Sequence, residues 1–100
     1  MARVSETEVE IAVVKYLYGL AGHTATIREI KKALPNFLDL STADRRQSDT
    51  RPGEELWEQQ VRNIVSHRNT PGNFIFEGRL EHAPGRLTLT PAGHVYAGTL

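Results

Sequence analysis

The sequence predicts a small α+β domain that is mainly helical, with three main helices, a minor helix, a two-stranded β-hairpin and a short C-terminal helix. Three observations carry this prediction. Apolar residues recur at helical spacing in three segments before Arg68. They alternate with polar residues in two short runs after Asn73, as in half-buried strands. A length of 100 residues suits one compact core, so we expect a single domain over residues 1–100.

Capping signals mark the starts of the first two helices. Ser5 with Glu8, and Thr26 with Glu29, form the pattern in which each side chain accepts from a backbone N–H group at the helix start. Apolar residues follow both signals at helical spacing. Pro35 is expected to end the second helix, because proline lacks the N–H group that continues the helical ladder.

The third main helix is expected from about Pro52 to Arg68. Proline is tolerated in a first helical turn, and the glutamates that follow it suit the positive N-terminal end of a helix. Before this helix, Ser41 with Asp44 predicts a minor helix of one or two turns through Arg46. The apolar stripe of the third helix comprises Trp57, Val61, Ile64 and Val65.

The two alternating runs, "FIFEGRLEH" and "RLTLT", predict a hairpin with its tip near Pro84-Gly85. Thr90 followed by Pro91 then predicts the start of the short terminal helix. Three helices followed by a hairpin is the element order of a winged helix-turn-helix. In this interpretation the third helix is the recognition helix and the hairpin is the wing.

The charges balance overall, with twelve Lys/Arg against twelve Asp/Glu, whereas a dedicated DNA-binding domain usually has a basic excess. Their distribution is uneven, since residues 59–100 carry four arginines, only two glutamates and three of the four histidines. The sequence contains no cysteine, no signal-peptide pattern and no apolar run of membrane-spanning length. We therefore expect a cytoplasmic protein without a membrane partner.

Polar residues gather on the side of the third helix opposite its apolar stripe. Arginine can donate two hydrogen bonds to guanine, and asparagine or glutamine can pair with adenine, so this side has the chemistry of base reading. Donors near the helix end suit phosphates. We expect the DNA-facing residues to be Gln59, Arg62, Asn63, Ser66, His67 and Arg68, with Arg79 and Arg86 on the hairpin.

The same polar pattern also suits functions other than DNA binding. Polar residues cover most surface helices, and a winged helix can instead serve as a protein-interaction or homodimerisation module without DNA binding. Trp57 has the phase of a core residue, although as the single tryptophan it is also a candidate contact to a modified base. No catalytic constellation, metal-ligand spacing or phosphate-binding loop is evident, so we expect no enzyme activity, metal or cofactor in this chain.

Two segments extend this interpretation through a resemblance. "LSTADRRQSDTRPGEELWEQQVRNIVSHR" and "GNFIFEGRLEHAPGRLTLTPAGHVYAG" together resemble the Mrr-type N-terminal winged-helix domain of restriction-system proteins. The resemblance covers about residues 7–98 and is specific mainly over 40–96. There a Leu-Ser turn, an arginine-containing loop, a Trp- and Arg-bearing helix, a wing and "LTPAG" follow one another in order.

The resemblance implies binding of double-stranded DNA by a module that recruits a linked or associated nuclease, and some relatives read methylated bases. Carried over by position, Arg51 joins the DNA-facing residues named above. A methylated adenine needs a small apolar or aromatic contact, for which Trp57 is the candidate. The chain has no room for a nuclease domain, so we expect either a free-standing DNA binder or a domain taken from a longer restriction protein.

Overall fold

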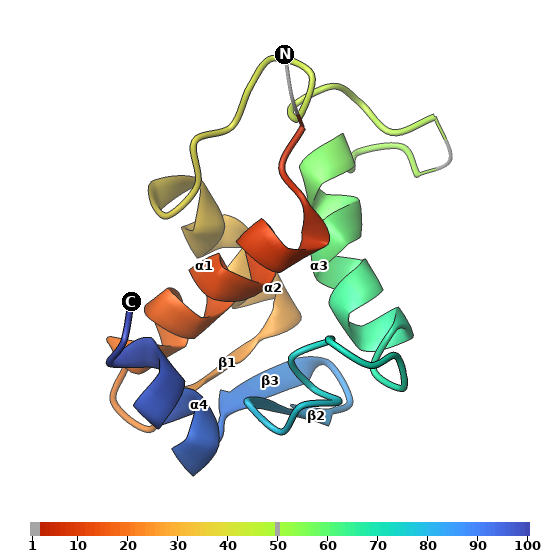
Figure 1. Cartoon of the computed structure of the whole chain (residues 1–100). Coiled ribbons are helices and arrows are strands. Elements are labelled where there is room, and N and C mark those ends of the chain that lie inside the picture. The colour runs from red at the N-terminus through yellow and green to blue at the C-terminus, as the bar shows by residue number, and fades with distance from the viewer. Residues whose placement is uncertain (1–2, 50) are drawn as a thin grey trace.

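The computed structural model describes residues 3–49 and 51–100. Within these ranges the chain forms four α-helices and a three-stranded antiparallel sheet, so the predicted α+β class is confirmed (Figure 1). No helix in the described ranges has both the length and the apolar character needed to cross a lipid bilayer. The elements in chain order are α1 (Glu6–Tyr18), β1 (Thr24–Thr26), α2 (Ile27–Ala33), the 3-10 helix η1 (Leu34–Asn36), α3 (Leu56–Ser66), β2 (Leu80–Ala83), β3 (Arg86–Leu89) and α4 (Pro91–Ala97).

The predicted capping boxes are present at the starts of α1 and α2. Ser5 Oγ accepts from the N–H of Glu8 at 3.0 Å, and Glu8 Oε1 accepts from the N–H of Ser5 at 3.0 Å. Thr26 and Glu29 make the same reciprocal pair, at 3.1 and 2.8 Å. Thr90 Oγ1 caps α4 by accepting from a backbone N–H of its first turn at 2.9 Å. Local sequence therefore determines where these three helices begin.

β3 is the central strand of the sheet, with β1 on one side and β2 on the other. Ala83 pairs with Arg86 across a two-residue loop, so the hairpin tip lies at Pro84-Gly85, as predicted. Gly85 has a φ of 71°, which suits the third residue of a type II turn, where proline is common at the second. The carbonyl of Gly85 accepts from the N–H of Ile27 at 2.9 Å, which ties the hairpin tip to the start of α2.

The predicted strand beginning at Phe74 was wrong, because residues 74–78 form turns and β2 begins after them. Asn73 accounts for the difference. Its Oδ1 accepts from the N–H groups of Ile75 at 2.8 Å and Phe76 at 3.3 Å. A side chain that satisfies successive backbone N–H groups offers the chain an alternative to a strand ladder. Phe76 is consequently 51% exposed and takes no place in the core.

The helices near the middle of the chain also differ from their predictions. α3 begins at Leu56, well after Pro52, because the chain reverses in a turn before the helix. Pro35 lies inside η1, so the helical path continues for one 3-10 turn beyond α2. Residues 42–45 form a turn where a minor helix was predicted.

Asp44 forms a buried junction in place of that minor helix. Its Oδ1 accepts from the N–H of Val4 at 2.9 Å, and its Oδ2 accepts from the N–H and the hydroxyl of Ser41 at 2.9 and 3.0 Å. The residue is 1% exposed. Burial opposes ionisation of Asp44, but these hydrogen bonds outweigh burial and hold its pKa below the ordinary value. The carboxylate thus joins the N-terminal segment to the loop that precedes α3.

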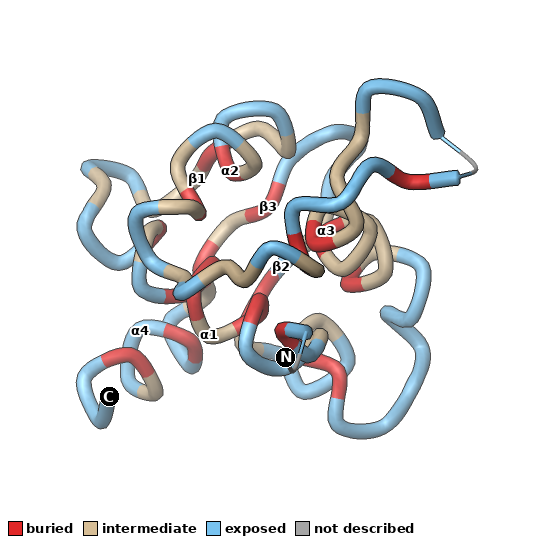
Figure 2. Tube along the Cα trace, turned by 90° about the horizontal axis from the view of Figure 1, so that it is seen from above, coloured by how far each residue is buried: buried red, intermediate tan, exposed pale blue. Residues whose placement is uncertain are grey.

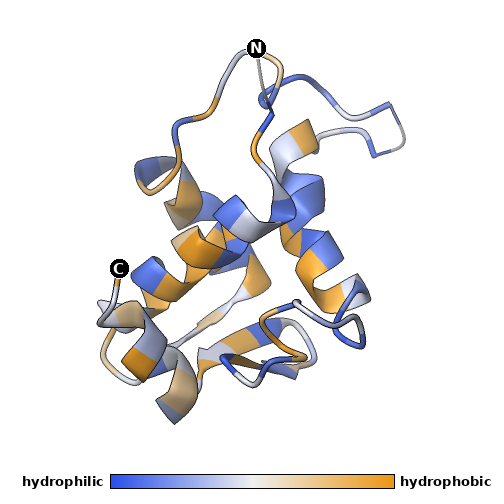
Figure 3. Cartoon of the chain, in the orientation of Figure 1, coloured by the Kyte–Doolittle hydropathy of each residue, from blue (hydrophilic) through white to orange (hydrophobic). Residues whose placement is uncertain are grey.

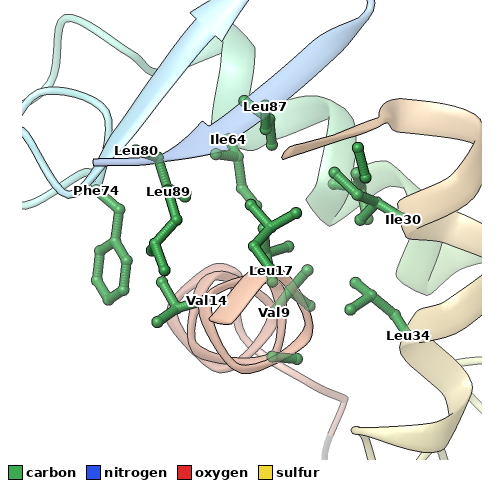
Figure 4. Packing of buried hydrophobic residues seen from close by; sticks show 14 of the residues in the cluster. Val9, Val14, Leu17, Ile30, Leu34, Ile64, Phe74, Leu80, Leu87 and Leu89 are labelled. Atoms are coloured by element: carbon green, nitrogen blue, oxygen red, sulfur yellow. The ribbon is translucent and has the colours of Figure 1, made fainter. Parts of the chain in front are cut away.

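α1 lies at the centre of the core. Figure 4 shows Val14 and Leu17 of α1 meeting side chains of α2, α3 and the hairpin, among them Ile30, Ile64 and Leu80. Figure 3 shows orange positions along the helix with blue ones between them, and most of its buried residues are aliphatic. Full burial of each such side chain contributes about 1.5–3 kcal/mol relative to exposure. The other three helices and the hairpin therefore share one core in which α1 contacts each of them.

Gly93 is expected to tolerate no side chain. A Cβ atom there would lie 2.0 Å from the carbonyl oxygen of Arg79 and 2.7 Å from Cδ1 of Leu89. Gly93→Ala should therefore lower the free energy of unfolding by about 2–4 kcal/mol in urea denaturation. Gly98→Ala is the matched control. A Cβ at Gly98 would meet the carbonyl oxygens of Val95 at 3.4 Å and His94 at 3.8 Å, so this variant should lose much less stability. Equal losses in both variants would contradict this prediction.

Asp44→Asn should reveal the contribution of the buried carboxylate. Because the pKa of Asp44 is lower in the folded than in the unfolded chain, its stabilisation is present above the unfolded pKa and is lost as pH falls through the folded pKa. At neutral pH the wild type should exceed Asp44→Asn by about 1–3 kcal/mol in the free energy of unfolding. Urea denaturation at a series of pH values should show this difference narrowing in acid. A difference that does not change with pH would count against it.

Candidate functional site

α3 turns one face to the core and leaves the other accessible. Trp57, Val61 and Ile64 are its buried residues, and Val65 is partly buried against the same cluster, which confirms the predicted apolar stripe. Figure 2 shows the division as red positions separated by tan ones along α3. The predicted polar residues that occupy the remaining surface of the helix are Gln59, Arg62, Asn63 and Ser66.

The loop before α3 satisfies N–H groups at the start of that helix. The N–H of Leu56 donates to the carbonyl of Arg46 at 2.8 Å, and the N–H of Trp57 donates to the carbonyl of Asp44 at 3.0 Å. The first N–H groups of any helix lack partners within the helix, so these bonds hold the loop against it. The loop is largely hydrophilic, as its blue colour in Figure 3 shows, yet its path is determined by the helix start.

A tight turn places two charged residues beside α3. The N–H of Glu54 donates to the carbonyl of Arg51 at 3.1 Å across Pro52 and Gly53, and Gly53 has a φ of 84°. Proline followed by glycine of positive φ again suits a type II turn. The carbonyl of Glu54 accepts from the N–H of Ser48 at 2.8 Å, which anchors the turn to the loop.

A groove of about 300 Å³ lies between α2, α3 and the tip of the hairpin, and we call it the α3 groove. Three cationic side chains, Lys31, Arg51 and Arg62, border it together with a single carboxylate, that of Glu54. Its lining comprises Ile27, Lys31, Arg51, Glu54, Arg62, Val65, Ser66, His82 and Gly85. Segments far apart in sequence therefore contribute to one cationic surface.

Glu54 bridges two of these cations. Its Oε1 accepts from Nη1 of Arg62, and its Oε2 accepts from Nζ of Lys31 at 3.3 Å. The Glu54 side chain is 12% exposed, against 33% for Arg62 and 28% for Lys31. Burial opposes ionisation of Glu54, but the hydrogen bonds from Arg62 and Lys31 outweigh it and hold the pKa of this carboxyl below its ordinary value. The carboxylate is therefore charged at neutral pH.

A second hollow, of about 730 Å³, continues the cationic surface toward the start of α3. It shares Ile27 and Lys31 with the α3 groove. Taken together, the two linings contain six cationic residues against three glutamates, so the balanced charge of the whole chain conceals a basic face. The cations are Arg28, Lys31, Lys32, Arg45, Arg51 and Arg62, and the glutamates are Glu54, Glu55 and Glu58.

Three of the predicted DNA-facing residues, Arg51, Arg62 and Ser66, come together at the α3 groove. Gln59 lies on the same exposed side of α3, and its Nε2 donates to Oγ of Ser48 at 2.6 Å. The preceding loop therefore restricts the Gln59 amide, while Ser66 at the end of the helix is exposed.

Asn63, His67 and Arg68, at and just beyond the end of α3, each have a hydrogen-bonding partner within the chain. Asn63 Nδ2 donates to Oε1 of Gln60 at 3.2 Å. His67 Nδ1 lies 2.8 Å from Oε1 of Glu6 at the start of α1, and Arg68 Nη1 donates to a carbonyl of the last turn of α3 at 2.8 Å. His67 borders a separate hollow of about 250 Å³ that also includes Glu6 and Glu10. These three residues do not line the α3 groove.

The two hairpin arginines have different positions. The Arg79 guanidinium carbon lies 4.9 Å from the ring centre of Phe74 and 4.2 Å from that of Tyr96, a cation–π arrangement at the base of the hairpin. Arg79 thus lies just before β2, on aromatic rings and away from the tip, and its predicted contact with DNA stays a prediction. Arg86 lies beside the tip and is exposed, and its Nη1 donates to Oγ1 of Thr24 on β1 at 3.2 Å.

Trp57 is a core residue in the structure. It is 3% exposed, and its Nε1 donates to Oε1 of Glu55 at 2.8 Å. A base cannot stack on a ring that is covered in this way, so the candidate contact to a modified base is not available in this conformation. The phase of Trp57 with Val61 and Ile64 accounts for its burial.

Lys31 and His82 border the α3 groove but were not among the predicted residues. Lys31 lies on α2 and His82 on β2, and only the packing of these elements brings them beside Arg62. The basic last turn of α2, which contains Lys31 and Lys32, was the available sequence signal. Among the described residues, no three His, Cys, Asp or Glu side chains are grouped as metal ligands.

The burial of Trp57 predicts its fluorescence. The folded chain should show a blue-shifted emission maximum and weak quenching by iodide, because the indole is shielded from water by the core. The chain unfolded in guanidinium is the matched control and should show red-shifted emission with strong quenching. Strong iodide quenching of the folded chain would contradict the core position of Trp57.

The chain matches no protein-family model, and it has no significant match among curated proteins or solved structures. Its topology and its surface chemistry are therefore the guides to its function. The feature that stands out is the cationic α3 groove, which unites α2, α3 and the hairpin tip.

Proposed function

We propose that this chain is a winged-helix DNA-binding domain. The order α1-β1-α2-α3-β2-β3, with β1 added to the hairpin in one antiparallel sheet, supports this assignment. In the proposed arrangement α3 is the recognition helix and the β2–β3 hairpin is the wing. The tip of the hairpin lies next to the end of α3, as both line the α3 groove.

The single observation that carries the proposal is the convergence of Lys31, Arg51 and Arg62 on the α3 groove. Phosphate contacts from lysine and arginine supply most of the affinity for duplex DNA and set the orientation of the protein on it. Ser66 adds an exposed hydroxyl on α3 at the same groove. A backbone strand passing between α3 and the hairpin tip would meet all four groups.

The polar face of α3 supports base contacts in the major groove. Gln59 is the candidate, because a glutamine amide can pair with adenine. It lies on this face, next to the loop. We assign Arg86 to the DNA backbone beside the wing tip, where its exposed side chain borders β1.

We further propose, from the sequence resemblance, that the domain serves a restriction or defence system of the Mrr type. In that setting it recognises double-stranded DNA for a linked or associated nuclease and performs no catalysis itself. Reading of a methylated base finds no support in Trp57, because that ring is covered. The binding test should therefore compare methylated and unmethylated duplexes of the same sequence.

The protein-interaction or homodimerisation alternative is favoured by a different surface. Val95 on α4 is 72% exposed, and Leu100, just beyond α4, is 52% exposed. Apolar side chains of this kind suit contact with another protein. This alternative is supported if sedimentation equilibrium shows a dimer and the chain does not bind duplex DNA at low salt.

Arg62→Ala should weaken binding of labelled DNA duplexes by about 1–3 kcal/mol in fluorescence anisotropy titrations, and by similar amounts for different sequences, as the loss of a phosphate contact does. The reason is that Arg62 is the guanidinium of α3 that borders the groove. Binding by the wild type should also weaken as salt rises, because neutralised phosphates release counterions.

Lys15→Ala is the matched control for the loss of one positive charge. Lys15 is exposed on α1 and borders a different hollow, which shares no lining residue with the α3 groove. Its affinity should stay within about twofold of the wild type, since a distant exposed charge is largely screened by salt. Equal losses for Lys15→Ala and Arg62→Ala would reject the groove as the DNA-binding surface.

A further inference from the structure

Within the α3 groove, two cationic groups from different helices point at one anionic position. Nζ of Lys31 and Nη1 of Arg62 bind the two oxygens of the same Glu54 carboxylate. A phosphodiester presents its charge on two equivalent oxygens in a similar way, and both lysine and arginine bind it well. The geometry that receives the carboxylate is therefore also suited to a DNA phosphate.

The loop before α3 has anchors that do not involve the Glu54 side chain. The loop is anchored through the backbone carbonyl of Glu54, which accepts from the N–H of Ser48 at 2.8 Å and from Nε2 of Gln47 at 3.0 Å. The backbone N–H of Glu54 donates to Arg51 in the type II turn. The carboxylate can therefore leave the two cations by side-chain rotation while the turn keeps its path.

We propose that Lys31 and Arg62 form a phosphate-binding subsite that Glu54 occupies in the free protein, and that a DNA phosphate displaces this carboxylate on binding. This inference rests on the proposed function. To bind these two cations, DNA must first displace the Glu54 carboxylate. The affinity for DNA is therefore lower than it would be if Lys31 and Arg62 had no internal partner. In this arrangement the cationic surface binds duplex DNA but binds other polyanions weakly.

The exchange also explains the placement of Arg62. Its bond to Glu54 holds the guanidinium at the edge of α3 beside Ser66 and the hairpin tip. When a phosphate replaces the carboxylate, the guanidinium keeps an anionic partner in the same place. Glu54 is thus a positioning residue for Arg62 in the free protein and a competitor of DNA for Arg62 and Lys31.

Glu54→Gln tests the exchange, because it keeps the shape of the side chain and removes its charge. Binding of a labelled duplex by the full chain should tighten on the order of tenfold, since two cations are freed from one internal anion. The dependence on salt should become steeper, because the released cations neutralise phosphate instead of carboxylate. Adding Lys31→Gln to Glu54→Gln should reverse most of this gain.

Asp39→Asn is the matched control for the loss of one negative charge. Asp39 is exposed and borders the hollow that contains Lys15, away from the α3 groove. Its affinity should change by less than about twofold. Thermal unfolding followed by circular dichroism verifies the fold of each variant, and Glu54→Ala replaces Glu54→Gln if the amide variant does not fold.

The outcomes separate this inference from the proposed function. If the wild type binds DNA but Glu54→Gln binds no more tightly, the subsite is wrong and the DNA-binding function stands. An equal gain for Asp39→Asn would also overturn the subsite, because net charge alone would then explain the effect. If neither the wild type nor Glu54→Gln binds at low salt, the function itself is rejected. Binding by Glu54→Gln alone would support the displacement of Glu54.

Discussion

Trp57, Val61 and Ile64 fix the rotation of α3 about its own axis by packing against the core that surrounds α1. The groove, the charge distribution and the proposed contacts all depend on this rotation. A different rotation would carry Arg62 or Gln59 into the apolar cluster, where an unpaired charged or polar group is strongly disfavoured. The apolar side of α3 must be buried, and this determines which side faces solvent. At the helix start, the carbonyls of Asp44 and Arg46 accept from the first N–H groups of α3.

Folding separates charges that the composition leaves balanced. Arg51, Arg62 and Lys31 meet on one side of α3, whereas Glu6 and Glu10 lie together beyond the C-terminal end of the same helix. Burial raises the pKa of Glu10, although its carboxylate accepts from the N–H of Phe74 at 2.8 Å. A chain with zero net charge can thus present faces of different charge, and under the proposed function such a difference would orient an approaching polyanion.

Local signals accounted for more of the fold than of the site. Helix starts at Ser5, Thr26 and Thr90 could be predicted because each depends on bonds within four residues. The turns after Asn73 could not be predicted in this way, because the alternating apolar residues there have the pattern of a strand. Only the structure shows that the side chain of Asn73 binds the backbone. The site was harder still. Lys31 meets Arg62 only through the packing of α2 beside α3, and Arg79 meets the rings of Phe74 and Tyr96 only in the folded chain.

The bond between Ile27 and Gly85 has a consequence for how this surface can respond to a partner. The hairpin tip is joined to the first residue of α2, and β1 is joined to β3, so both ends of the hairpin are linked to the helices. The surface is preorganised, so little conformational entropy remains to be lost when it is covered. Adjustment to shape must then come from the partner. A flexible ligand would have to bend to fit this domain. A stiff ligand would bind only if its shape already matched the surface.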